Sequence, residues 1–103
     1  MSKTSRPHDE AMVELLRQDP TFADEYLAAA LDEADQPGGR EALLSALRQI
    51  AEAQGMAVVA EKAGIPRESL YRALGPTGDP TIKTLLAVIN AAGLKLAVHR
   101  HAA

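Results

Sequence analysis

Apolar residues recur every three to four positions along most of this chain, which is the spacing of helices that bury one face. Leu43, Leu47 and Ile50, for example, fall on one such stripe. The stripes predict helices at residues 8–18, 22–34 and 40–55, two short helices within 58–74, and a helix from about 82 that ends at Gly93. The pattern therefore predicts an all-α protein that begins with two N-terminal helices.

Proline and glycine divide these stripes into segments. Gln36–Gly39 is the strongest boundary, and Gly75–Gly78 reads as a loop. We therefore expect an acidic helical arm at residues 1–38, a main domain at 39–93 and a tail at 94–103. The tripeptide Asp-Pro-Thr occurs at 19–21 and at 79–81, and we expect it to start a helix in the same way both times.

The tail departs from helical spacing. Leu94, Leu96 and Val98 alternate with other residues, which is typical of a β-strand. Because a lone strand leaves its backbone groups unpaired, we expect this one to pair with the same strand of a second copy. The tail thus predicts a homodimer, with a frayed terminus as the alternative.

Composition and charge narrow the class of protein. The chain of 103 residues has 3% aromatics and no cysteine, which suits one small helical domain in a reducing cytoplasm. It contains no apolar run long enough to cross a membrane and no signal-peptide core. Residues 1–37 carry three basic residues against nine carboxylates, whereas residues 38–103 carry eight against five. The acidic N-terminal part and the mildly basic C-terminal part suggest two different partners. Alternatively, the acidic residues simply solvate an exposed helix face.

The segment "VVAEKAGIPRESLYRAL" has the spacing of a helix-turn-helix. Ala60 allows two short helices to approach closely, and Gly64 permits the sharp turn. Ile65 fills the gap between the helices, and Leu70 faces the core. The order of helices around this motif is that of a λ-repressor-like domain, the fold class that we predict.

The second helix of the motif sends polar side chains away from the core. They are Arg67, Glu68, Tyr71 and Arg72. Arginine can bind guanine, glutamate can accept from cytosine, and tyrosine can contact a phosphate or a thymine methyl group. We expect these four to read operator DNA, with Thr77 and Lys83 as phosphate contacts.

Residues 23–98 also resemble the antitoxins of HigA-type addiction modules, the addiction-module antidote proteins. The resemblance rests on four stretches: "ADEYLAAALDEAD", "LLSALRQIAEAQGM", "AEKAGIPRESLYRAL" and "GPTGDPTIKTLLAVINAAGLKLAV". It implies a toxin partner of the RelE/HigB-like kind that cleaves messenger RNA. It also implies a dimer that represses its own operon. The acidic arm and the dimer seam would then meet a basic toxin.

The chain departs from this family at three positions. Ala57 and Val58 stand where the family often has serine and glutamine, so a phosphate contact and a base contact are in doubt. Pro66 stands where the family often has a serine cap, and proline offers no side-chain acceptor. These departures put the strength of DNA binding in doubt more than the fold.

Other chemistry is poorly supported by the sequence. His99 and His101 share a strand face without an evident third ligand, so we expect no metal. The carboxylates of His8-Asp9-Glu10 suit a helix start, and no catalytic combination or phosphate loop is evident. We therefore expect neither an enzyme nor a cofactor, and no small-molecule ligand. Two alternatives stay open: a free-standing prophage-type repressor, and a protein-interaction module that no longer binds DNA.

Overall fold

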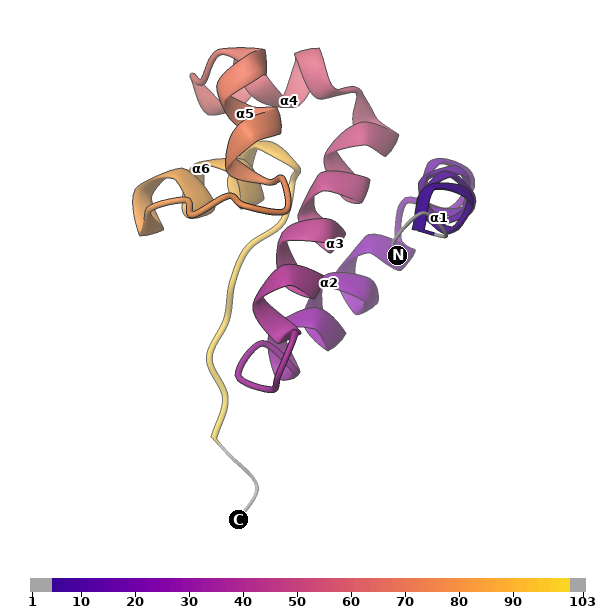
Figure 1. Cartoon of the computed structure of the whole chain (residues 1–103), viewed down its shortest axis with the longest axis vertical. Coiled ribbons are helices and arrows are strands. Elements are labelled where there is room, and N and C mark those ends of the chain that lie inside the picture. The colour runs from indigo at the N-terminus through magenta and orange to yellow at the C-terminus, as the bar shows by residue number, and fades with distance from the viewer. Residues whose placement is uncertain (1–4, 101–103) are drawn as a thin grey trace.

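The computed structural model describes residues 5–100, and within that range it is all-helical (Figure 1). Its helices are α1 (Ser5–Gln18), α2 (Phe22–Asp32), α3 (Gly39–Gln54), α4 (Met56–Ala63), α5 (Arg67–Ala73) and α6 (Ile82–Ala91). These helices confirm the all-α prediction. The largest shift at a helix start is in α1, which begins at Ser5 rather than at His8.

Helix α3 connects the two halves of the molecule. Helices α1 and α2 pack on α3, while α6 and α5 pack against α4, which follows α3 (Figure 1). Leu16 of α1 and Leu27 of α2 belong to the same hydrophobic cluster as Leu47, Leu70 and Val88. The N-terminal arm and the main domain therefore share one core, and removal of this apolar surface from water stabilises both.

The boundary before α3 depends on two neighbouring glycines. Gly38 has a φ of 78°, a left-handed conformation that side chains disfavour. At Gly39, a Cβ atom would lie 2.0 Å from the carbonyl oxygen of Glu33. The backbone that follows α2 is thus packed directly against the start of α3, which brings the arm back onto the main domain.

The two Asp-Pro-Thr segments start their helices differently. The Thr81 side chain accepts a hydrogen bond from the Thr84 N–H at 3.1 Å, as expected of an N-cap. Thr21 is already helical, and its hydroxyl donates to Asp19 at 2.7 Å instead. The prediction that both segments cap a helix in the same way was therefore wrong for the first.

Residues 94–100, the described part of the predicted C-terminal strand, form no strand. Residues 94–100 run without regular structure, and residues 5–100 contain no strand. The Leu94 N–H donates to the Ile89 carbonyl at 3.0 Å, which closes the end of α6 rather than a ladder between strands. Leu94 packs on the core, whereas Val98 is 98% exposed. The alternation of Leu94, Leu96 and Val98 does not mark one buried face, so the predicted strand ribbon across a dimer was wrong.

Candidate DNA-binding surface and adjoining hollow

The turn between α4 and α5 brings together the four residues predicted to shape it. Gly64 is left-handed, with a φ of 73°, and the Ile65 N–H donates to the Ala60 carbonyl at 3.0 Å. Ala60 and Leu70 are buried, and Ile65 packs on the core from a partly exposed position. Pro66 precedes α5 and gives it no side-chain cap. The small residue at 60 and the glycine at 64 allow the two short helices to meet across a tight turn.

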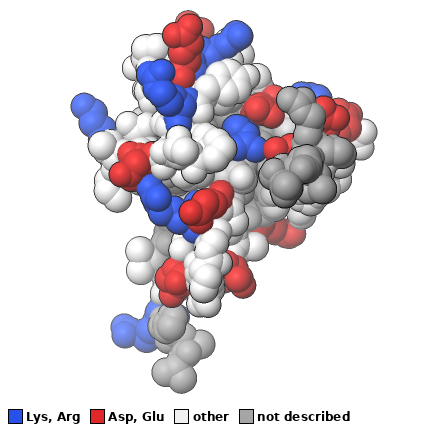
Figure 2. Space-filling view, in the orientation of Figure 1, with Lys and Arg blue, Asp and Glu red and all other residues white. Residues whose placement is uncertain are grey.

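The polar side chains of α5 lie on the face opposite Leu70. Arg67, Glu68 and Arg72 are exposed, and Tyr71 is 43% exposed. Over residues 8–100, no ion pair engages the guanidinium of Arg67 or Arg72. Figure 2 shows basic side chains, with acidic ones among them, at the end of the molecule that carries α4 and α5. Both guanidinium groups are thus free to bind a partner.

The loop after α5 is held against α3 by a residue that the sequence did not single out. The Arg40 guanidinium donates to the Gly78 carbonyl at 3.3 Å and to Asp79 at 2.6 Å. Gly78 also lies so close to the end of α5 that a Cβ atom would be 2.0 Å from the Ala73 carbonyl oxygen. Thr77 on this loop is exposed and lies near the end of α5 along the chain.

Lys83 lies in the first turn of α6 and is exposed. Thr77 and Lys83 thus lie on either side of the point where the loop after α5 enters α6. Arg67 and Arg72 lie on α5, which precedes this loop. The described residues place all six predicted DNA contacts on the segment from α5 to the start of α6.

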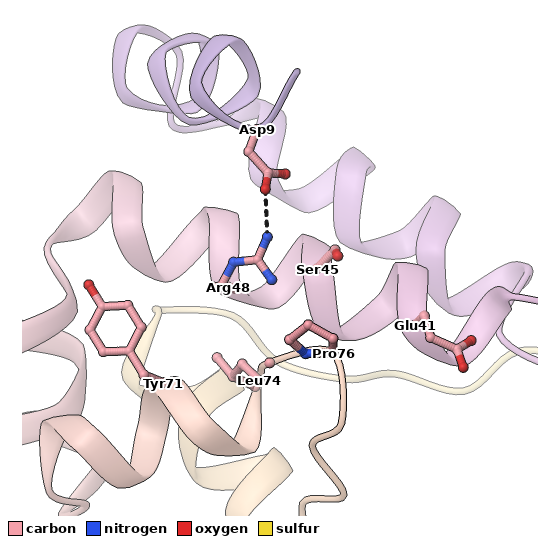
Figure 3. A pocket seen from close by; sticks show the side chains of 8 residues that line it. Asp9, Glu41, Ser45, Arg48, Tyr71, Leu74 and Pro76 are labelled. Carbon is pink, nitrogen blue, oxygen red and sulfur yellow. Dashed lines mark hydrogen bonds and ion pairs between the residues drawn. The ribbon is translucent and has the colours of Figure 1, made fainter. Parts of the chain in front are cut away.

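A hollow of about 500 Å³ lies between α1, α3 and α5 (Figure 3). Its walls are formed by Asp9, Glu41, Ser45, Arg48, Tyr71, Leu74, Gly75 and Pro76. The Tyr71 ring projects from α5 toward α3, beside Arg48 (Figure 3). Tyr71 therefore lines this hollow as well as the outer face of α5, where the sequence had placed it.

Asp9 is the centre of a polar network that joins the arm to α3. It accepts a hydrogen bond from Arg48 at 2.8 Å and another from Gln49, whose own side-chain oxygen accepts from the Tyr26 hydroxyl. Gln49 is buried, at 2% exposure, so its hydrogen bonds satisfy polar atoms that would otherwise be desolvated. Burial raises the pKa of Tyr26 above 10.0, and the Asp9 charge adds to this while Arg48 opposes it.

The sequence did not reveal this network. Because α1 begins at Ser5, Asp9 lies beyond the first turn and binds Arg48, rather than serving the helix start as predicted. The only signal is the polar pair Arg48-Gln49 beside the apolar stripe of α3. Such a pair also occurs on solvated helix faces, so the sequence alone does not show that Arg48 and Gln49 bind another helix.

The histidines and carboxylates that could bind a metal ion are not clustered in the described residues. Within the described residues, no three side chains of the His, Cys, Asp or Glu type are grouped to hold a metal ion. His99 is exposed on the tail, and His101 lies outside the described residues. No helix in the described part of the chain is long and apolar enough to cross a membrane.

These features define a small helical protein with two short helices at a glycine turn and an acidic arm folded onto its core. Comparison with known proteins gives its class. A profile of the family described as "Probable addiction module antidote protein" matches residues 4–100, so the chain belongs to that family. Family membership supports an antidote role and implies a toxin as partner.

A similar protein was also found. An uncharacterised protein of Haemophilus influenzae is 41% identical to this chain over 78 residues, which cover 76% of this chain and 80% of the relative. A comparison with solved structures gave no match.

Proposed function

We propose that this antidote neutralises a RelE/HigB-like toxin that cleaves messenger RNA and, as a homodimer, represses its own operon. In this proposal the chain is a cytoplasmic binding protein rather than an enzyme. Helices α4 and α5 form a helix-turn-helix, and α5 enters the major groove of operator DNA. The observation that carries the DNA-binding part is the outer face of α5, where two arginines follow a left-handed glycine turn and form no ion pair within residues 8–100.

The contacts divide into two kinds. Arg67, Glu68 and Arg72 stand on the exposed face of α5, where a bidentate arginine discriminates guanine by about 1–3 kcal/mol. Thr77 and Lys83 lie on the loop and on α6, and they contact phosphates, which fix the position of the protein without reading sequence. Tyr71 lines the hollow but is 43% exposed, and its exposed part contacts a phosphate or a thymine methyl group beside α5.

A homodimer matters because one copy has few basic residues at this surface. Lys62, Arg67, Arg72 and Lys83 are opposed by Glu61, Glu68 and Asp79 over residues 56–91, so non-specific attraction to DNA is weak. Two copies related by a two-fold axis would present two α5 helices to two half-sites. Because the C-terminal strand is absent, this dimer does not rest on a strand ribbon.

DNA binding is tested with a gel shift on the DNA upstream of the operon. Arg67→Ala combined with Arg72→Ala should abolish specific binding and leave the helical circular dichroism unchanged, because both side chains are exposed. The matched control, Arg17→Ala with Lys95→Ala, removes the same charge away from α5 and should bind as the wild type does. Specific binding that survives the loss of both α5 arginines would refute the assignment of the reading residues.

One observation favours a second function for the α4–α5 surface. Val58 is 48% exposed on α4, Ala57 beside it is exposed, and Pro66 gives α5 no side-chain cap. In this alternative, the exposed apolar side chains of α4 bind a protein, and the surface no longer binds DNA. A wild-type protein that forms a stable complex with the toxin but shifts no upstream DNA would support this alternative.

A further inference from the structure

A groove of about 510 Å³ runs between α2 and the tail. One wall is formed by α2, where Leu27 is buried at the floor, Leu31 is partly exposed and Ala28 is exposed. Leu94 and Leu96 line the opposite wall. Apolar side chains thus line both walls of an open groove, and a partner that filled it would remove them from water.

The α2 side of this groove is acidic. Asp24 and Asp32 line it, Glu25 is exposed on the same helix, and Glu33 is exposed directly after it. Over residues 8–100, none of these four carboxylates takes part in an ion pair. Lys95 and His99 stand on the tail side, so the negative charge is confined to the α2 edge. The groove therefore suits a segment with apolar side chains in its centre and basic side chains toward α2.

We propose that this groove is where the toxin docks, through an amphipathic segment that presents lysine or arginine to Asp24 and Asp32. The inference rests on the proposed function, because it assumes a toxin that cleaves RNA. An enzyme that binds a polyanion carries a basic surface. Charge complementarity at the α2 edge speeds the encounter and disfavours acidic partners.

A second copy of this chain fits the groove less well than a toxin does. A two-fold dimer brings the same patch of each copy together, so two acidic α2 edges would enter one interface. Four groove-lining carboxylates, Asp24 and Asp32 from each copy, would then be opposed by only two lysines, Lys95 from each copy. Like charges in that arrangement oppose association.

The groove also lies apart from the proposed DNA-binding surface. None of its lining residues belongs to α4 or α5. In Figure 1, α4 and α5 occupy one end of the molecule, and the tail runs past α2 and α3 toward the other end. A toxin in the groove therefore leaves the outer face of α5 uncovered.

Neighbouring alanines on α2 provide a matched test. Ala28 and Ala29 are both exposed, but only Ala28 lines the groove. The probe is the protein encoded by the neighbouring reading frame, co-expressed with each variant and its affinity measured by calorimetry. Ala28→Arg should weaken the complex by about tenfold or more, because it fills the groove and repels basic groups, while Ala29→Arg should bind within about twofold of the wild type.

A charge-reversal pair tests the acidic edge separately. Asp24→Lys with Asp32→Lys should weaken binding and reduce its dependence on salt, because the attraction to the basic segment is lost. Glu10→Lys with Glu61→Lys makes the same change in charge at exposed positions outside the groove and away from α2, and it should leave both properties nearly unchanged.

The outcomes separate the two proposals. Failure of the wild-type protein to bind the neighbouring gene product or to rescue growth would refute the proposed function, and the groove inference with it. If the wild type binds but the Ala28 and Ala29 variants behave alike, the groove inference alone is wrong. Formation of a dimer that Ala28→Arg disrupts, with toxin affinity unchanged, would assign the groove to a second copy instead.

Discussion

At the scale of single residues, Tyr26 connects ionisation to stability. Its hydroxyl donates to the buried Gln49, and its ring stacks on Phe22 with centroids 5.7 Å apart. Burial and the Asp9 charge raise its pKa above 10.0, so the folded protein favours the neutral phenol. The stability that depends on this preference is fully present below pH 10 and is lost as the pH rises through the pKa of the folded state.

The variant Tyr26→Phe tests this directly. At neutral pH it should lose about 1 kcal/mol of unfolding free energy, because Gln49 loses a donor. As the pH rises through the folded-state pKa of Tyr26 the two proteins should converge, because only the wild type has a phenol at position 26 to ionise. Urea unfolding monitored by circular dichroism across this range measures the difference. A gap that stays constant with pH would contradict the role of Tyr26 ionisation.

Gly39 illustrates a glycine that is required by contact rather than by its φ angle. In most helices, replacing glycine by alanine stabilises the protein. Here Gly39→Ala should destabilise it by about 1–3 kcal/mol, because the added Cβ meets the Glu33 carbonyl and the backbone of Ala34.

The neighbouring Gly38→Ala gives a comparison for this prediction. Gly38 has open space around its Cα, so alanine there meets only the cost of a left-handed backbone, about 1 kcal/mol. Thermal unfolding of both variants should show the larger loss for Gly39→Ala. Equal losses would mean that the chain after α2 moves aside easily.

Residue roles were predictable only where they depend on neighbours in the sequence. Gly64 and Ala60 were placed in the turn from their spacing alone, because a tight turn and a close approach impose local requirements. Asp9 and Arg48 are 39 residues apart, and their pairing depends on how α1 lies on α3. No local pattern encodes that packing, so the network appeared only in the structure.

At the scale of elements, α1 is attached to α3 by the Asp9 network as well as by apolar contacts. The Asp9 and Arg48 side chains are 29% and 19% exposed, so their ion pair is partly shielded from water. Removing Arg48 leaves Asp9 with only the hydrogen bond from Gln49, and removing Asp9 leaves Arg48 with only Glu52, 3.9 Å away. Either loss costs more than the loss of an exposed pair.

A double-mutant cycle measures this attachment. Asp9→Ala and Arg48→Ala should each lower the unfolding free energy by about 1–3 kcal/mol, and the double variant should lose less than the sum. Arg17→Ala is a suitable control, because its pair with Glu14 is exposed and contributes little. Additive losses would show that Asp9 and Arg48 do not act together.

Helices were predictable and the tail was not, for one physical reason. A helix satisfies its hydrogen bonds within its own segment, so the apolar period in sequence is enough to locate it. A strand needs a neighbour, and alternation alone does not supply one. In the tail, Leu94 packs on the core, Leu96 lines the groove and Val98 is exposed to solvent. The three alternating residues therefore do not share one buried strand face.

At the scale of the whole molecule, the shared core predicts one cooperative unfolding transition. The chain offers a reporter in each half, because its two tyrosines are Tyr26 on α2 and Tyr71 on α5. In Tyr71→Phe the remaining tyrosine reports on the arm, and in Tyr26→Phe it reports on α5. Each fluorescence curve should coincide with the circular dichroism curve of the same variant. An arm signal that melts first would show that the arm unfolds separately.

The sequence suggested two partners from its uneven charge and assigned the toxin to the acidic arm, but it could not locate the groove between α2 and the tail. The exposed face of α5 follows from helical periodicity and was predicted residue by residue. The groove between α2 and the tail depends on a contact between segments about 60–75 residues apart, and only tertiary structure supplies it.

Helix α3 has a consequence for how such a protein can diverge. Its sixteen residues span about 24 Å, and it connects the acidic groove of the arm to the helices that carry the arginine face. Under the proposed functions, a lineage can alter α2 and the tail as its toxin changes while keeping its operator, or alter α5 while keeping its toxin. Only the side chains that α3 buries are under selection from both partners at once.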